Sequence, residues 1–589
     1  MNGKSSALFQ SLISVSQGEE GADFYFKNGK VLNVFTGEIL DGNVAVRKKH
    51  IAYVGTSEKM VKPGTEIIDV KGAYLVPGFI DAHCHPDLYS NPASFCDHVV
   101  RHGTTTIFVD AQDLCNSFGM EGFKELLTAS YSYPVRAFFL VPAVSPPFPG
   151  VEGEELFDDL QMTEFLKMPR VTGLAEITSY TRILKGDQSL LARIASARNT
   201  GKTVEGHTSG ASYEKLNVLV AGGLTSCHES VTPDDVRNRL RLGLYTMIRC
   251  GSIRCELDML GAVLRERNIS QSSRVILTPD GLFPDRIMRD GYMDYVIEKA
   301  GQAGVDVVQA IRMCTINPAL YAGMDHDLGA IAPGRLADIL VLKNLENPTP
   351  HTVMQDGRMV VINGEYLLEP SPRPKIRDQG KPFLIKEKFP DLFRVKAAMD
   401  RSRGIPVAVI ENKTLTRRQD LILPIQDGYL EADPANDIFK ATVLLRNGKM
   451  HNSGFVKGLG VDADAISSSV CHEIHEILVL GRKDTAMQMA LQRLQEIKGG
   501  VVIVKGQRIV HEMRLPVGGT MSIGSFEETA NDLTSIKQIF RSLGCTLEEP
   551  LWTIWFLTFS PLIELRLTVS GMYDVKQGKI VFDAKNPLF

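Results

Sequence analysis

From residue 73 to residue 318, short apolar runs alternate with amphipathic stretches of helical length. This pattern is typical of a parallel sheet whose strands are joined by helices. Eight apolar runs have the length of strands, and they cover residues 75–83, 104–111, 137–143, 171–177, 203–207, 224–228, 245–249 and 274–280. Helix candidates between them cover residues 189–198, 213–221 and 233–242. Eight strand and helix pairs in about 250 residues predict an α/β fold with a closed (β/α)8 TIM-like barrel.

The segments on either side of this barrel have a different texture. Residues 22–72 alternate polar and apolar side chains between Asn-Gly and similar turn signals, and residues 337–342 and 359–365 do the same. We therefore expect one small β-sandwich domain built from residues 1–72 and 325–370, around a barrel of residues 73–324. A Pro-rich, polar stretch near residues 369–375 predicts a linker. Residues 376–589 then form a third, α+β domain, with a helix over residues 485–497.

Length and composition agree with a large soluble protein of two or three domains. The chain has 589 residues, of which 44% are hydrophobic and 23% charged, and its formal net charge is -4. Basic residues form no dense stripe, so nothing favours nucleic acid as a partner. The run at residues 551–567 is apolar, but Pro561 and Glu564 interrupt it, which favours a buried core element over a membrane span.

Cysteine usage and the N-terminal residues favour the cytoplasm. The nine cysteines are scattered and include no Cys-x-x-Cys pair, so reduced thiols are the simplest interpretation. The first residues lack the basic start, long apolar stretch and cleavage site of a signal peptide.

Histidines and carboxylates stand at the ends of the predicted strands. Side chains alternate along a strand, so His83 and His85 point to the same side. Such a pair alone is more often hydrogen-bonded than metal-bound. Here, however, further metal-ligating residue types end four other predicted strands: Glu176, His207, His228 and Asp280. Because active sites of these barrels lie at the carboxyl ends of the strands, the six residues predict a metal site.

Four imidazoles and two carboxylates can hold two divalent metal ions. The nitrogen and oxygen donors suit Mn²⁺, Fe²⁺ or Zn²⁺ and do not choose among them. We expect Mn²⁺ or Fe²⁺, with Zn²⁺ possible. Such a pair of ions lowers the pKa of a shared water and supplies a nucleophile at neutral pH. Attack on a carbon that carries a nitrogen requires a carboxylate to bring a proton to that nitrogen, and Asp280 and Glu229 are the candidates for this catalytic role.

Several motifs resemble a known family. The stretch Pro-Gly-Phe-Ile-Asp-Ala-His-Cys-His at residues 77–85 is similar to the amidohydrolase superfamily, as are Gly-Leu-Ala-Glu ending at Glu176, Glu-Gly-His ending at His207 and the stretch before His228. Nearly the whole chain resembles the bacterial adenine deaminases, through Leu-Arg-Leu-Gly at residues 240–243 and motifs of the last third such as Ser-Ser-Ser-Val-Cys-His at residues 467–472.

This resemblance implies roles for individual residues. The metal ligands would be His83, His85, Glu176, His207, His228 and Asp280, and Glu176 would bridge the two ions. Glu229 would lie near the substrate ring and take part in its proton transfers. For substrate binding, we expect residues on the loops over the barrel mouth and at the strand ends: Asp87, Gln112, Asp113, Arg249 and Phe283.

Three loops depart from the family pattern. Where the family has Ile-Glu-Ser-Ser after the first histidine pair, this chain has Pro-Asp-Leu-Tyr-Ser at residues 86–90. Residues 110–113 read Asp-Ala-Gln-Asp in place of Asp-Pro-His-Glu, and residues 281–283 read Gly-Leu-Phe where a second Asp, a basic residue and His are common. A site that pairs with one heterocycle rejects others, so these changes keep the identity of the substrate open.

Three functions therefore remain as hypotheses. The first is deamination of adenine, the best single guess for a small heterocyclic substrate. The second is opening of a cyclic amide in an oxidised or reduced purine or a ureide ring, and the third is a non-catalytic binding or scaffold protein. Relatives are commonly dimers or larger, so we expect a homodimer or larger homo-oligomer. For His472 and His475 a structural or supporting role is favoured over a third metal.

Overall fold

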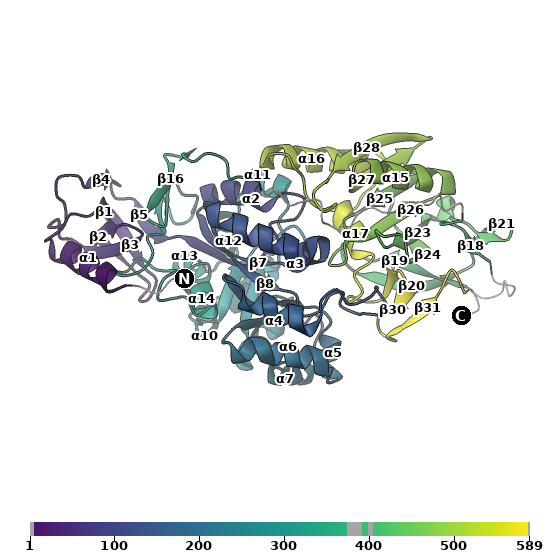
Figure 1. Ribbon diagram of the computed structural model, residues 1–589, viewed down its shortest axis with the longest axis horizontal. Helices are drawn as coiled ribbons and strands as arrows, with labels where there is room; N and C mark the ends of the chain where they lie inside the picture. Colours follow the sequence, from purple (N-terminus) through teal and green to yellow (C-terminus); the bar gives the residue numbers. More distant parts are fainter. Residues whose placement is uncertain (1–4, 374–390, 398–403, 587–589) are drawn as a thin grey trace.

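The computed structural model describes residues 5–373, 391–397 and 404–586, and these form three parts (Figure 1). An N-terminal sheet lies at one end, a barrel in the middle and the C-terminal part at the other end. Residues 374 and 375 of the predicted linker, and the predicted start of the third domain at residue 376, lie outside the described residues. The exact domain boundaries stay predictions.

The middle part is the predicted barrel. Its eight strands pair in sequence order, each parallel to the next. They are β6 (Phe79–Cys84), β7 (Thr104–Asp110), β8 (Arg136–Val141), β9 (Val171–Ile177), β10 (Thr203–Gly206), β11 (Ser226–Cys227), β12 (Tyr245–Arg249) and β13 (Val275–Thr278). A single bridge between Cys84 and Asp280 joins the first strand to the end of the last, so the barrel is nearly closed. The predicted (β/α)8 fold is confirmed.

The first predicted strand, residues 75–83, is in fact two strands. β5 (Tyr74–Pro77) pairs with strands of the N-terminal sheet, and only β6 belongs to the barrel. The break falls at Pro77 and Gly78. Pro77 has no N–H to continue a ladder, and a Cβ at Gly78 would lie only 2.2 Å from Thr105 Oγ1. Glycine thus lets the chain pass closely from one sheet to the other.

Helices connect the barrel strands and cover its outside (Figure 1). The three predicted helices are present as α6 (Gln188–Asn199), α7 (Tyr213–Ala221) and α8 (Pro233–Arg241), and Thr232 caps α8 with a capping box. The other helices of this part are α2 (Pro92–Val99), α3 (Gln112–Ala129), α4 (Asp159–Lys167), α5 (Tyr180–Leu184), α9 (Leu257–Leu264), α10 (Arg267–Ser270), α11 (Pro284–Asp290), α12 (Met293–Gln302), α13 (Val307–Met313) and α14 (Ile316–Tyr321), with 3-10 turns η1 (Val100–His102) and η2 (Ser130–Ser132).

The N-terminal sheet contains strands from both sides of the barrel in sequence, as their texture suggested. Its order is β17-β16-β15-β14-β5-β1-β2-β3, with β4 paired to β1. Helix α1 (Ser6–Gln17) packs beside it. The strands are β1 (Phe24–Asn33), β2 (Glu38–Arg47), β3 (His50–Gly55), β4 (Glu66–Asp69), β5, β14 (Ile339–Leu342), β15 (Thr352–Gln355), β16 (Arg358–Ile362) and β17 (Glu365–Tyr366).

The C-terminal part is built on an eight-stranded sheet of order β20-β19-β24-β23-β26-β25-β27-β28. Its strands are β19 (Ile405–Ile410), β20 (Thr416–Leu421), β23 (Ile438–Leu444), β24 (His451–Lys457), β25 (Ala465–Ser468), β26 (Ile477–Gly481), β27 (Gly500–Lys505) and β28 (Arg508–Arg514). Two small sheets contain β18 (Val395–Lys396), β21 (Ile425–Gln426), β22 (Tyr429–Leu430), β29 (Leu565–Thr568), β30 (Gly571–Asp574) and β31 (Lys579–Phe582). The helices are η3 (Pro434–Asn436), α15 (Asp484–Glu496), α16 (Phe526–Ser542) and α17 (Pro550–Phe556).

The apolar run at residues 551–567 lies in the interior. It forms most of α17, a loop and the start of β29, and α17 is buried along its whole length. Among the described residues, no helix has both the length and the apolarity to cross a membrane. Helix α17 lies where the C-terminal part meets the barrel (Figure 1). There Trp552 stacks on Phe283 of the barrel with ring centroids 4.8 Å apart, so α17 brings the C-terminal part against the strand ends.

Candidate metal centre

The first group of candidate ligands comes from the ends of β6 and β13. His83 and His85 direct their Nε2 atoms to one place, 3.2 Å apart, as strand alternation predicted. Asp280 follows β13, and its Oδ1 lies 3.2 Å from His83 Nε2 and 3.5 Å from His85 Nε2. All three side chains are buried. They can offer three donor atoms to one metal ion.

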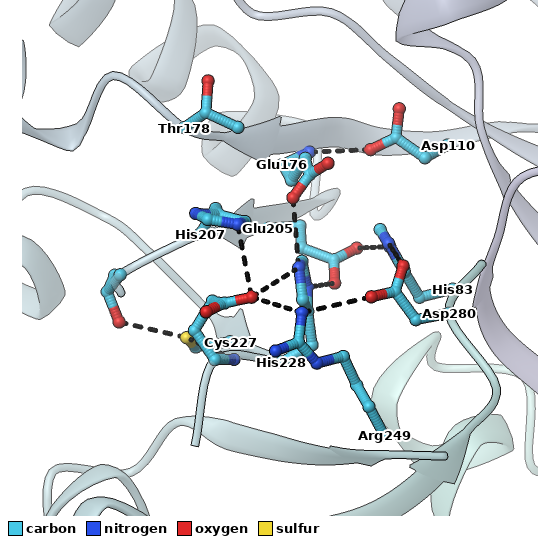
Figure 2. A network of polar contacts seen from close by, with 12 residues as sticks. His83, Asp110, Glu176, Thr178, Glu205, His207, Cys227, His228, Arg249 and Asp280 are labelled. Atoms are coloured by element: carbon cyan, nitrogen blue, oxygen red, sulfur yellow. Dashed lines mark hydrogen bonds and ion pairs between the residues drawn. The ribbon is translucent and has the colours of Figure 1, made fainter. Parts of the chain in front are cut away.

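A second group comes from β9, β10 and β11. His228 Nε2 lies 3.1 Å from Glu176 Oε2, and one donor atom each of Glu176, His207 and His228 can be chosen so that all lie within 4.8 Å of one another. Glu176 also forms such a group with His83 and Asp110. Figure 2 shows Glu176 above His207 and His228, with His83 and Asp280 beside them. The carboxylate of Glu176 is therefore close to His83 of the first group as well as to His207 and His228 of the second.

Glu205 was not predicted as a functional residue, although it stands at the centre of this arrangement. Its side chain is fully buried on β10. Oε2 lies 3.2 Å from His83 Nδ1, and Oε1 lies 3.1 Å from His228 Nδ1 (Figure 2). The contact with His228 Nδ1 is a hydrogen bond, and the contact with His83 Nδ1 is a close electrostatic pair. A carboxylate beside both Nδ1 atoms favours protons on them and leaves both Nε2 lone pairs free. Glu205 thus fixes the tautomer that a metal ligand needs.

These residues fit divalent metal ions. Two imidazole Nε2 atoms 3.2 Å apart need a proton or a cation between or beside them, because two lone pairs repel. Glu176 Oε2 is buried and lies 3.1 Å from His228 Nε2, so one cation could accept a lone pair from each atom. The atoms that could bind a metal ion are nitrogen and oxygen. Neither Cys84 nor Cys227 belongs to a candidate metal-binding group among the described residues. This donor set suits Mn²⁺, Fe²⁺ or Zn²⁺.

Electrostatics in the site follow from burial and close pairing. Burial opposes the charge on His85, yet a hydrogen bond to Asp280 raises its pKa to about 9. Burial and the neighbouring His83 likewise oppose the charge on His228, while hydrogen bonds to Glu176 and Glu205 raise its pKa to about 10. Without a metal, the cluster therefore holds protons on its imidazoles at neutral pH.

The two candidate proton carriers share one arginine. Arg249, at the end of β12, donates through Nη1 to Glu229 and also to Asp280 Oδ2 at 3.2 Å. Burial opposes ionisation of Glu229, but the charges of Arg249 and His207 hold its pKa well below the usual range. Burial also opposes ionisation of Asp280, but hydrogen bonds from His83 and His85, helped by Arg249, hold its pKa equally low. Both carboxyls are therefore ionised at neutral pH.

A pocket opens over this cluster. The candidate ligands His85, Glu176, His207, His228 and Asp280 line it. The C-terminal part supplies five further lining residues: Thr414, His472, Trp552, Phe556 and Leu562. The barrel alone thus forms only part of the pocket wall.

The chain was compared with known proteins. The profile of the amidohydrolase family matches residues 74–365, and that of the adenine deaminase C-terminal domain matches residues 413–579. An adenine deaminase of Moorella thermoacetica is 35% identical over 581 residues, with 97% of each chain covered. Adenine deaminase 2 of Carboxydothermus hydrogenoformans is 33% identical over 577 residues, with 97% of this chain and 99% of that protein covered.

The chain belongs to the adenine deaminase family of amidohydrolases. The resemblance inferred from the barrel motifs and the last third of the chain is thereby confirmed. It is an enzyme of the amidohydrolase type, and its barrel carries buried groups of histidine, aspartate and glutamate that could hold metal ions.

The residues expected to bind substrate in this family member divide into two sets. Asp113 and Arg249 line the pocket. Asp87, Gln112 and Phe283 are buried but are not part of its described lining. Burial and then the charge of Asp113 raise the pKa of Asp87 to about 8, so it is protonated at neutral pH. Of the three departing loops, Leu88 and Asp113 are the residues that reach the pocket.

His472 and His475 belong to a buried segment of the C-terminal part that lies against the barrel mouth. His475 Nε2 is 3.0 Å from Asp113 Oδ1. His472 lines the pocket, and burial lowers its pKa to about 4, which keeps the imidazole neutral. Donor atoms of Glu176, His472 and Glu473 can be chosen within 4.8 Å of one another. The sequence had singled out both histidines without locating them.

The cysteine interpretation needs one correction. Cys250 and Cys255 form a disulfide, so the expectation of reduced thiols is wrong for this pair. The other seven cysteines are free and buried. The disulfide closes the loop after β12, whose Ile253 and Arg254 line the pocket. The sequence gave no sign of the pair, because its spacing of five residues matches no common motif.

Proposed function

We propose that the protein hydrolyses the exocyclic C–N bond of adenine, giving hypoxanthine and ammonia. The observation that carries the proposal is a pair of adjoining ligand groups: His83, His85 and Asp280 form one, and Glu176, His207 and His228 form the other. Glu176 also forms a group with His83 and so connects the two. Relatives that cover the chain almost completely are named adenine deaminases, which points to adenine as the substrate.

Six residues would hold the metal ions. His83, His85 and Asp280 would bind one ion, His207 and His228 the other, and Glu176 would bridge them. When bound, the ions act as Lewis acids and supply a water-derived nucleophile at neutral pH. Glu205 would keep His83 and His228 in the ligating tautomer through their Nδ1 atoms. We expect Mn²⁺ or Fe²⁺, with Zn²⁺ as the alternative.

Asp280 and Glu229 would move the protons. Water adds to the ring carbon and loses one proton, and the amino nitrogen must gain one before it leaves as ammonia. Asp280 is ionised, so it can accept the first proton and deliver it to the nitrogen. Glu229, linked to Asp280 through Arg249, would hold a ring N–H and take part in the same transfer.

The pocket suits a planar heterocycle. Trp552 and Phe556 give it aromatic walls, and Leu88 and Leu562 add apolar surface. Arg249, Arg254 and Asp113 place polar groups at its sides. Such a mixture fixes the orientation of a flat, polar-edged ring. Because Leu88 and Asp113 belong to loops that depart from the family pattern, the test must include rings other than adenine.

The test is incubation of Mn²⁺- or Fe²⁺-loaded protein with aminopurines, oxopurines and ureide rings, while ammonia and ultraviolet spectra are followed together. Ammonia from adenine with a hypoxanthine spectrum would support the proposal. Loss of ring absorbance with an oxopurine and no ammonia would instead favour the ring-opening alternative. Inactivity of metal-replete protein on every ring would contradict both and favour a binding protein. The expected homodimer or larger assembly stays a prediction, which sedimentation of the same preparation can check.

A further inference from the structure

The C-terminal part contributes one imidazole to the pocket. His472 is 8% exposed and lines the pocket together with Glu176 and His85. Its ring centroid is 6.5 Å from that of His85, which brings the two imidazoles edge to face across the pocket. A side chain 296 positions away from Glu176 in the sequence is therefore part of the same wall.

Packing holds the His472 ring in place. Its centroid lies 5.0 Å from the ring of Phe556 and 4.4 Å from that of Phe559. The backbone N–H of His472 donates to the carbonyl of Trp555 at 3.4 Å. Rings packed on two sides leave an imidazole few rotamers, so its nitrogens keep a fixed direction.

The segment that carries His472 is itself fixed to the barrel. Asn116 donates through Nδ2 to the carbonyl of Glu473, and Thr178 Oγ1 donates to Glu473 Oε2 at 3.3 Å. Glu473 and His475 have φ angles of 63° and 43°, in the left-handed region. Non-glycine residues remain there when surrounding contacts determine the backbone, and such residues cluster at functional sites.

One nitrogen of this ring has no partner. His472 Nδ1 is buried and makes no hydrogen bond to any described residue. A buried polar atom left unpaired costs free energy, and most such atoms in proteins do find a partner. A neutral imidazole carries one N–H donor and one lone pair, so it can pair with either kind of ring nitrogen on a heterocycle.

We propose that His472 is a substrate-binding residue whose imidazole forms a hydrogen bond with a ring nitrogen of the purine. The C-terminal part then contacts the substrate directly, so it contributes to substrate recognition as well as to the pocket wall. This inference rests on the proposed function for the identity of the ring. Its rival is a third metal ligand, since Glu176, His472 and Glu473 lie close enough to share a cation.

Three substitutions at this position separate the hydrogen bond from the packing. His472→Phe keeps a ring between Phe556 and Phe559 but removes both nitrogens. His472→Asn keeps a polar nitrogen near the Nδ1 position, and His472→Gln keeps one near the Nε2 position. We expect His472→Phe to lower kcat/KM for adenine roughly tenfold, mainly through KM, because one hydrogen bond is lost. One of His472→Asn and His472→Gln should recover most of this loss, and the variant that does so identifies the contacting nitrogen. The matched control is His98→Phe, because His98 is a buried histidine that stacks on Phe526 and is not among the residues that line the pocket.

Substrate analogues locate the partner atom. 1-Deazaadenine, 3-deazaadenine, 7-deazaadenine and 9-deazaadenine each lack one ring nitrogen. The loss of affinity that His472→Phe causes should disappear for the one analogue that lacks the contacted nitrogen. It should persist for the other three analogues, as in a double-mutant cycle. An equal penalty for all four analogues would overturn the proposal and assign His472 a packing role.

Binding gives a readout that does not depend on turnover. The chain has two tryptophans, Trp552 and Trp555, both in α17, and Trp552 lines the pocket. Quenching of their fluorescence by adenine or hypoxanthine therefore measures affinity in metal-depleted protein. We expect roughly tenfold weaker binding in His472→Phe and near-normal binding in His98→Phe.

The outcomes are distinguishable. If the wild type releases ammonia and His472→Phe matches it in KM and affinity, the inference fails and the proposed function stands. If the wild type binds purines through His472 but releases no ammonia, deamination fails and the inference stands. Loss of bound metal in His472→Phe, measured by elemental analysis, would favour the third-ligand rival and overturn the proposal.

Discussion

Arg249 Nη1 lies 3.2 Å from Asp280 Oδ2, at the neighbouring ends of β12 and β13. The same nitrogen donates to Glu229, and Nη2 lies 3.3 Å from Glu256 Oε1. One buried guanidinium therefore holds together the carboxylates to which we assign the proton transfers. Arginine suits this position because it stays charged when buried and presents several donors in a fixed fork.

The first prediction concerns this arginine. Arg249→Met removes the positive charge that keeps Glu229 and Asp280 ionised, so the pKa of both carboxyls should rise. Catalysis needs both carboxyls in their ionised forms to accept protons. The acid limb of the pH profile of kcat/KM should therefore move to higher pH by about one to three units. Arg254→Met is the matched control, because Arg254 Nη1 lies 3.8 Å from Glu229 and its side chain is more exposed. Its acid limb should move much less.

An unshifted acid limb in Arg249→Met, together with normal metal content, would contradict the assignment of Glu229 and Asp280. Thermal unfolding should be measured in parallel, since removing one partner of a buried pair leaves uncompensated charge and costs about 3–5 kcal/mol. A lower Tm with an unchanged pH profile would give Arg249 a structural role only.

The second prediction concerns Glu205. Glu205→Gln has one acceptor oxygen in place of two, so it can satisfy the Nδ1 proton of His83 or of His228, but not both. The other imidazole would move its proton to Nε2 and lose its ligating lone pair. We expect metal affinity to fall about 10- to 100-fold, measured by competition with a chelator. Glu152→Gln, a buried carboxylate that accepts from Ser560, should retain wild-type affinity. Equal affinities in both variants would count against the role of Glu205.

The barrel and its ligands could be predicted from the sequence because their signals are local. Strand runs and polar residues at strand ends located His83, His207 and Asp280 without knowledge of distant contacts. Glu205 had a signal as well: it precedes His207 by two residues within the strand predicted over residues 203–207, so alternation predicts that both side chains point to the same face. A carboxylate in that position is a candidate partner for a neighbouring imidazole, and the pattern was overlooked.

The rest of the site depends on how distant segments pack. Trp552 and His472 reach the pocket because α17 and the segment after β25 dock on the barrel, and no periodicity in the sequence specifies that docking. Phe283 shows the converse. It lies on the loop that follows Asp280, the candidate metal ligand at the end of β13, and was therefore expected to bind substrate. In the structure it instead packs against Trp552 and Tyr89. An apolar residue in a loop over the barrel serves domain packing as readily as substrate recognition.

The third prediction is a pH dependence of metal binding. In metal-free protein the pKa of His85 is raised to about 9 and that of His228 to about 10. A raised pKa contributes stability that is full below the ordinary histidine value near 6.5 and is lost as pH rises through 9 to 10. The metal-free protein should therefore lose thermal stability between about pH 7 and pH 10. Metal must displace these protons, so its affinity should rise over the same interval.

Thermal shift with and without Mn²⁺ measures both effects. The gain in Tm from the metal should be larger at pH 9 than at pH 7. His85→Gln removes one of the two groups and should flatten the pH dependence of the metal-free protein. If the gain from Mn²⁺ were the same at both pH values, the imidazoles would not be the protonated groups that the ions displace.

The fourth prediction separates packing from substrate contact at the two stacked rings. Phe283 is fully buried outside the pocket, so Phe283→Leu should lower the free energy of unfolding by about 1–2 kcal/mol and leave KM nearly unchanged. Trp552→Leu removes the neighbouring ring that lines the pocket, so it should raise KM for adenine several-fold, because base and aromatic side chain no longer stack. Denaturant unfolding and steady-state kinetics on both variants decide the matter. Stability alone cannot decide, because two packed rings can both stabilise the fold while only one of them contacts the substrate. A rise in KM in Phe283→Leu as large as that in Trp552→Leu would therefore indicate that Phe283 contributes to substrate binding.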